Sequence, residues 1–120
     1  MRAYLVIASA LALATAPALA ADDIMAGFYG NTVISTGGML ESHTHYKADH
    51  TFDVSATAMG QSFTGKGTWA IDDKGQLCRT FDPPVPGRTN PDCGALESHA
   101  VGDKWTAADG ANITLVQGVN

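Results

Sequence analysis

Short runs of strand-forming residues, each followed by a Gly, Asp or Asn cluster, occupy this chain from residue 28 to residue 119. The runs are rich in Thr, Val, Phe, Trp and Ser. Their alternation with turn-forming clusters is typical of antiparallel strands joined by tight turns. We therefore predict an all-β protein, an antiparallel up-and-down meander of about eight short strands that closes into a small barrel; a β-sandwich is the alternative. The expected strands are Phe28–Thr36, Leu40–Lys47, Thr51–Ala58, Ser62–Ile71, Gln76–Phe81, Ala95–Val101, Lys104–Ala107 and Asn112–Val119.

The first 20 residues have the pattern of a cleavable secretory signal. Arg2 is their only charged residue, an Ala/Leu-rich apolar run follows it, and Ala18 and Ala20 are the small residues that signal peptidase requires. No later stretch approaches the ~20 apolar residues of a membrane helix. We predict a signal peptide over residues 1–20, a single β-barrel domain over residues 21–120, a periplasmic or secreted location and no membrane insertion.

The chain is acidic, with 7 Lys and Arg against 12 Asp and Glu and a formal net charge of −5. Cleavage would remove Arg2 and leave six basic residues against twelve acidic ones, a net charge of −6. Nucleic acids and anionic membrane surfaces attract clustered Lys and Arg, and the sequence contains no such cluster. We expect a monomer whose partner is a small ligand or a protein, with no nucleic acid bound.

Cys78 and Cys93 are the two cysteines of the chain. In an oxidising compartment two cysteines most simply form one disulfide, which we predict here. A free reactive thiol and a two-cysteine metal site are the alternatives. The stretch Asp82–Asp92 between them carries four prolines, which cannot donate to a sheet, so it is expected to form a loop clamped by the disulfide. Arg88, near the tip of this loop, could contact a partner.

Three short motifs carry a family resemblance: Phe28-Tyr29-Gly30-Asn31-Thr32, then Gly67-Thr68-Trp69, then Gly75-Gln76-Leu77-Cys78. They resemble small exported bacterial domains of unknown function with lipocalin-like barrels, in which a Gly-Thr-Trp strand leads through a Gly turn into a Leu-Cys strand. The chain is also similar, more faintly, to the periplasmic inhibitors of secreted metalloproteases. Both resemblances imply binding rather than catalysis. The inhibitors act through an N-terminal segment that enters the protease cleft, and Ala21–Met25 does not match that segment clearly.

The hairpin from Leu40 to Ala58 is the stretch whose register the sequence specifies best. Apolar residues alternate along both strands, and a three-residue loop, Ala48-Asp49-His50, places Tyr46 on the same face as Phe52. Such loops end in a left-handed residue, and His is one of the few side chains besides Gly enriched in that conformation. The opposite face then carries only polar side chains, which are Glu41, His43, His45, Lys47, Thr51, Asp53, Ser55 and Thr57.

This polar face contains a candidate metal site. His43 and His45 project side by side from one strand, and His45 faces Asp53 across the hairpin. Two imidazoles at this spacing can reach one Zn²⁺ or Cu²⁺ when a third ligand, Asp53 or Glu41, approaches. A water-facing strand surface without metal is the alternative.

We predict no enzymatic activity. His99 with Glu97 has the residue types of an acid/base pair but no recognisable nucleophile beside it. The leading function is therefore a periplasmic non-enzymatic binding or accessory protein without a resident cofactor. The alternatives are an inhibitor of a secreted hydrolase such as a protease, and a metal-binding module using His43 and His45. Small barrels either hold a ligand or are filled by side chains, and the sequence leaves both open.

Overall fold

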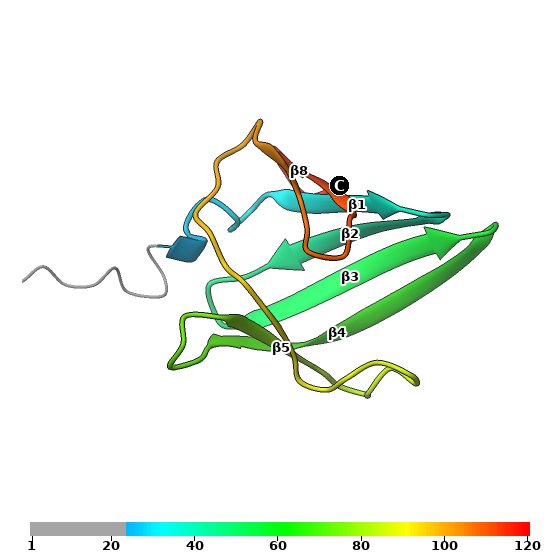
Figure 1. The fold of residues 1–120 in the computed structure, drawn as a ribbon, viewed down its shortest axis with the longest axis horizontal. Helices are drawn as coiled ribbons and strands as arrows, with labels where there is room; N and C mark the ends of the chain where they lie inside the picture. The colour runs from blue at the N-terminus through cyan, green and yellow to red at the C-terminus, as the bar shows by residue number, and fades with distance from the viewer. Residues whose placement is uncertain (1–23) are drawn as a thin grey trace, which may run out of the picture.

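A computed structural model describes residues 24–120, which form one eight-stranded antiparallel sheet (Figure 1). The predicted signal peptide, residues 1–20, lies outside the described residues. No helix within residues 24–120 is long and apolar enough to cross a membrane. The strands are β1 (Thr32–Gly37), β2 (Leu40–Tyr46), β3 (Thr51–Ala58), β4 (Gln61–Ile71), β5 (Leu77–Phe81), β6 (Asp92–Gly94), β7 (Lys104–Thr106) and β8 (Asn112–Val116).

The prediction of an all-β antiparallel meander is confirmed. The strands follow the order β6-β5-β4-β3-β2-β1-β8-β7. Each pairing joins strands that are consecutive in the chain, except the pairing of β1 with β8. The sheet curls into a half-barrel, with β6 and β7 at its two edges (Figure 1). Closure of these edges into a complete barrel stays a prediction.

Three expected strands differ from the structure, and one of them, Asn112–Val119, ends at Val116. The first strand begins at Thr32 rather than Phe28, because a short helical turn at Ile24–Met25 and the turns after it let Phe28 enter the core. The stretch predicted as the strand Ala95–Val101 is not a strand, and the short strand β6 forms just before it.

The stretch 95–101 follows a different path because its side chains are used for packing. Leu96 packs against the core, and the imidazole of His99 stacks on the indole of Trp105, with ring centroids 3.4 Å apart. Gly27 lies against the backbone of His99 so closely that an added Cβ would overlap the His99 carbonyl oxygen. These contacts hold the segment against the N-terminal turn rather than along a sheet edge.

Aromatic side chains fill one end of the half-barrel. Phe52 is 1 % exposed and meets Phe81 edge to face, with ring centroids 5.1 Å apart. The alternation along β3, β4 and β5 brings these rings onto one face, since neighbouring residues on a strand point to opposite sides. The buried apolar core consists of Met25, Phe28, Tyr46, Phe52, Trp69, Phe81 and Leu115.

The predicted disulfide between Cys78 and Cys93 is present and joins directly paired residues of β5 and β6. The next pair along these strands, Arg79 and Asp92, forms an ion pair with Nη2 to Oδ2 at 2.8 Å. The side chain of Asn90 completes the attachment, because it accepts from the Phe81 N–H and donates to the Phe81 carbonyl. The proline-rich connection is therefore tethered at both ends, and the disulfide is compatible with an extracytoplasmic compartment.

Candidate functional site

The polar face of β2 and β3 has the predicted register. The Lys47 N–H donates to the Thr51 carbonyl at 2.9 Å, and His50 has a φ of 70°, so the three-residue loop is confirmed. The carboxylate of Asp49 accepts from both the backbone N–H and the hydroxyl of Thr51, and these hydrogen bonds lower the pKa of Asp49. The ring of His50 stacks on Trp69, which packs the loop against the filled end of the half-barrel.

His45 and Asp53 form the predicted cross-strand pair. The two residues are direct partners in the sheet, and Nδ1 of His45 donates to Oδ1 of Asp53 at 2.7 Å. Nζ of Lys47 lies 3.1 Å from Oδ2 of the same carboxylate. Partial burial pushes the pKa of Asp53 upward, but the hydrogen bonds and positive charges of His45 and Lys47 outweigh it, so the pKa is lowered overall.

Asn120, the last described residue, lies over this face, and its main-chain oxygen contacts both imidazole rings. The main-chain oxygen of Asn120 is 3.0 Å from Nε2 of His45 and 3.4 Å from Nδ1 of His43. The other nitrogen of His43 lies 2.9 Å from a carboxylate oxygen of Glu41. All four ring nitrogens therefore face oxygen acceptors, whereas a metal ligand needs a nitrogen with a free lone pair.

His43, His45 and Asp53 consequently do not converge as a ligand set in the structure. A single group of three His, Cys, Asp or Glu side chains within residues 24–120 has ligand atoms all within 4.8 Å of one another, and it is Asp72 with Cys78 and Cys93. Metal binding by His43 and His45 stays a prediction that requires the Asn120 contacts to open.

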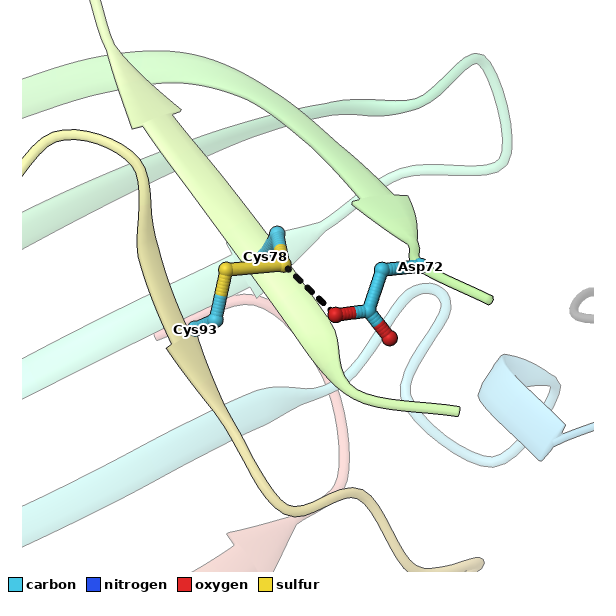
Figure 2. Close-up of side chains that lie close together, drawn as sticks. All are labelled: Asp72, Cys78 and Cys93. Atoms are coloured by element: carbon cyan, nitrogen blue, oxygen red, sulfur yellow. Dashed lines mark hydrogen bonds between the residues drawn. A yellow bond between two sulfur atoms is a disulfide. The ribbon is translucent and has the colours of Figure 1, made fainter. Parts of the chain in front are cut away.

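Figure 2 shows the arrangement of Asp72 beside the disulfide. Oδ2 of Asp72 lies 3.7 Å from Sγ of Cys78, while its other oxygen accepts from the backbone N–H groups of Lys74 and Gln76. Both sulfur atoms are bonded to each other, so neither is a thiolate that could coordinate a cation. Asp72 thus acts as the acceptor that shapes the turn between β4 and β5.

The pair of His45 and Asp53 should contribute stability in a pH-dependent way. We expect Asp53→Asn to lower the free energy of unfolding by less than about 1 kcal/mol at neutral pH, because the pair is partly exposed. Since the folded pKa of Asp53 lies below the unfolded value of about 3.9, this contribution is present above that value and is lost as the pH falls through the folded pKa.

Urea unfolding of the wild type and the variant from about pH 2 to pH 7 measures the effect. Asp73→Asn, at an exposed turn position, is the matched control. A difference between wild type and Asp53→Asn that stays constant across this range would contradict the assignment.

A charged cluster beside the aromatic core was not predicted from the sequence. The Arg79 guanidinium lies 5.6 Å from the centre of the Phe81 ring, and Asp92 accepts from both Arg79 and Arg88 at 2.8 Å. Burial raises the pKa of the Tyr46 hydroxyl, against the opposing effect of Arg79. The sequence does contain a signal for this cluster. Arg79 alternates with the apolar residues Leu77 and Phe81, so the three side chains share one face of β5.

The opposite end of the half-barrel carries exposed apolar side chains, which were also missed. Met39 and Leu40 lie at the β1–β2 turn, and Met59 and Phe63 lie at or near the β3–β4 turn. Because β2 and β3 are neighbours in the meander, the two turns lie at the same end of the sheet (Figure 1). The exposed fractions are 74 % for Met39, 43 % for Leu40, 79 % for Met59 and 53 % for Phe63.

We call Met39, Leu40, Met59 and Phe63 the apolar rim. A shallow hollow of about 460 Å³ is lined by Met39, Leu40 and Met59 together with polar residues of the neighbouring strands. Met59 has a φ of 51°, a left-handed conformation that is unfavourable for a side chain of this kind. Met39 follows Gly38 and Met59 precedes Gly60, and a methionine directly beside a glycine between two expected strands was the sequence signal that could have indicated this rim.

The remaining predicted residues take structural roles. His99 lies 3.3 Å from Asp103 and 3.8 Å from Glu97, with its ring stacked on Trp105. Arg88, expected near a loop tip, is turned back toward Asp92. No family model, curated protein or solved structure matches this chain.

Proposed function

We propose that this chain is a periplasmic or secreted, non-enzymatic binding or accessory protein that holds its ligand or partner at the apolar rim. The observation that carries the proposal is the exposure of Met39, Leu40, Met59 and Phe63 together at one end of the half-barrel. Single exposed apolar residues are ordinary, whereas a group of them on adjacent turns marks an interaction surface.

The residue types of the apolar rim suit binding. Methionine is unbranched and polarisable, so it adapts to varied apolar partners. Met59 keeps a left-handed backbone at an exposed turn where Gly or Asn would fit without strain, and such an outlier supports a functional role.

The two ends of the half-barrel differ in a way that favours the rim over the interior. Small barrels of the lipocalin-like kind can hold one ligand inside. Here Phe52, Trp69 and Phe81 fill one end, so the end that carries the apolar rim offers the accessible surface. The resemblance to lipocalin-like exported domains supports the same class of function.

The alternative functions have less support from the geometry. An inhibitor that inserts its N-terminal segment into a protease cleft needs that segment free, and Met25 is fully buried in the core. A metal site at His43 and His45 would need to displace Asn120 from both rings. Binding at the apolar rim requires no such rearrangement, because its side chains are already exposed.

Binding of 1-anilinonaphthalene-8-sulfonate, an apolar fluorescent probe, tests the rim directly. The double variant Met39→Gln/Met59→Gln should bind the probe at least about tenfold more weakly, since burying one such side chain is worth about 1.5–3 kcal/mol. Val119→Gln, which changes an apolar residue that is 70 % exposed outside the rim, should bind as the wild type does.

Native mass spectrometry of protein purified from its own cells tests the function itself. We expect an added mass from a retained ligand or partner, and we expect the double variant to lose it. Equal probe affinity in the double variant and the wild type, or an added mass that survives the substitutions, would overturn the assignment to the rim.

A further inference from the structure

The strand β4 is much longer than the strand that pairs with its outer edge. β5 pairs with Gly67–Ile71, whereas β3 pairs with Gln61–Thr68. Within the described chain, Gln61–Gly65 therefore have a partner strand on one side only. Figure 1 shows the β3–β4 hairpin extending beyond the end of β5. Gln61, Ser62, Phe63 and Thr64 are all exposed, so no other segment among residues 24–120 covers this open edge.

The hydrogen bonds at the end of this edge show which backbone groups point outward. The Lys66 carbonyl accepts from the Asp82 N–H on the β5 side, and the Trp69 N–H donates to the His50 carbonyl on the β3 side. Because successive residues of an antiparallel strand direct these groups to opposite sides, Ser62 and Thr64 point theirs to the same side as Lys66. Their N–H and carbonyl groups therefore face the open edge.

We propose that this edge pairs with the same edge of a second copy of the chain, antiparallel and about a two-fold axis that passes between the two Phe63 residues. In this register Ser62 of one copy and Thr64 of the other form hydrogen-bonded pairs on both sides of the axis. The proposal replaces the expectation of a monomer and does not rest on the proposed binding function.

The edge is self-complementary, which is why a second copy is the partner that fits. A two-fold interface presents the same surface twice, so each free N–H must meet a free carbonyl of the same short segment. Ser62 and Thr64 meet this condition with each other. A register centred on Thr64 would instead use the carbonyl of Lys66, which already accepts from Asp82.

Side chains and charge agree with this register. Phe63 would face Phe63 of the second copy in a close, non-hydrogen-bonded pair, where aromatic cross-strand contacts stabilise a sheet. Lys66 is the only ionisable residue between positions 60 and 66, and it would face Gly60 of the second copy. No like charges are brought together. The pairing joins the two apolar rims at Phe63 and leaves Met39, Leu40 and Met59 of each copy outside the paired segments.

Sedimentation over a concentration series tests the pairing through the variants Thr64→Pro and Thr64→Val. Proline removes an N–H that the isolated chain does not use, and an edge position of this kind tolerates it. We expect a wild-type dimer that Thr64→Pro weakens at least about 100-fold and that Thr64→Val, which keeps the N–H, retains. Circular dichroism and urea unfolding of both variants check that the fold is unchanged.

Oxidative cross-linking tests the register. Phe63→Cys should form a disulfide between copies, because the non-hydrogen-bonded pair on the two-fold axis brings its Cα atoms to about 4.5 Å. Ser62→Cys, one residue away and on the other face, should not. Peptide mapping distinguishes this bond from the one between Cys78 and Cys93.

A wild-type protein that sediments as a monomer up to about 1 mM would overturn the proposal. So would a Thr64→Pro variant that dimerises like the wild type, or equal cross-linking at positions 62 and 63. The double variant Met39→Gln/Met59→Gln should dimerise normally, so loss of probe binding and loss of dimerisation are separate results.

Discussion

Phe52→Ala is expected to lower the free energy of unfolding by about 4 kcal/mol, within the range for truncating a buried aromatic residue. The Phe52 side chain is 1 % exposed and contacts Tyr46, Phe81 and the Arg79 guanidinium. Removing the ring would leave a cavity among residues held by two different strands, β2 and β5, which cannot collapse around it without disturbing the sheet. Urea unfolding followed by tryptophan fluorescence measures the change.

Phe63→Ala is the matched control, because it makes the same chemical change on the same face of the sheet. Phe63 is 53 % exposed, so its truncation should lower the free energy of unfolding by less than about 1 kcal/mol at dilute protein concentration. Equal losses in the two variants would contradict the assignment of the filled end and the open end of the half-barrel.

Removing the disulfide with Cys78→Ala/Cys93→Ala is expected to lower the free energy of unfolding by about 3 kcal/mol. The two cysteines are 15 residues apart, and the cross-link restricts the unfolded chain by an amount that depends on this loop length. Because β6 is only three residues long, the Arg79–Asp92 ion pair would remain as its main attachment beyond the backbone pairing.

Reduction provides the control for this variant. A dithiol reductant should destabilise the wild type by a similar amount and leave the double variant unchanged. A wild type whose unfolding is insensitive to reductant, although its cysteines become alkylated, would show that the disulfide does not stabilise the fold.

Most of the strand pattern and one complete register could be predicted from the sequence. The β2–β3 hairpin is the clearest example, since Phe52 and Tyr46 had to share a face and a slip of one residue would have turned both toward water. The loop that satisfies this condition has three residues, and His50 adopts the left-handed conformation that the loop requires. The partner of His45 followed from the same reasoning.

The predictions failed where a segment's conformation depends on distant residues. Ala95–Val101 has the composition of a strand, but Leu96 packs against the core and the ring of His99 meets Phe28, far away in the sequence, edge to face. Strand propensity is a weak preference that such packing overrides. Asn120 reaches the imidazoles of β2 because β8 pairs with β1, a contact that no local pattern specifies.

The sequence by itself determined the alternation of faces, the turns and the cysteine pairing, because each depends on neighbouring residues or on the presence of only two cysteines. Only the tertiary structure decided which end of the half-barrel is filled by side chains and which apolar residues stay exposed. It also decided that β4 extends beyond the end of β5. These features depend on how a curled sheet places whole strands against one another. Burial and free edges are properties of that arrangement. The strand pattern alone therefore predicts that Phe63 belongs to the core, whereas in the protein its side chain lies at the surface.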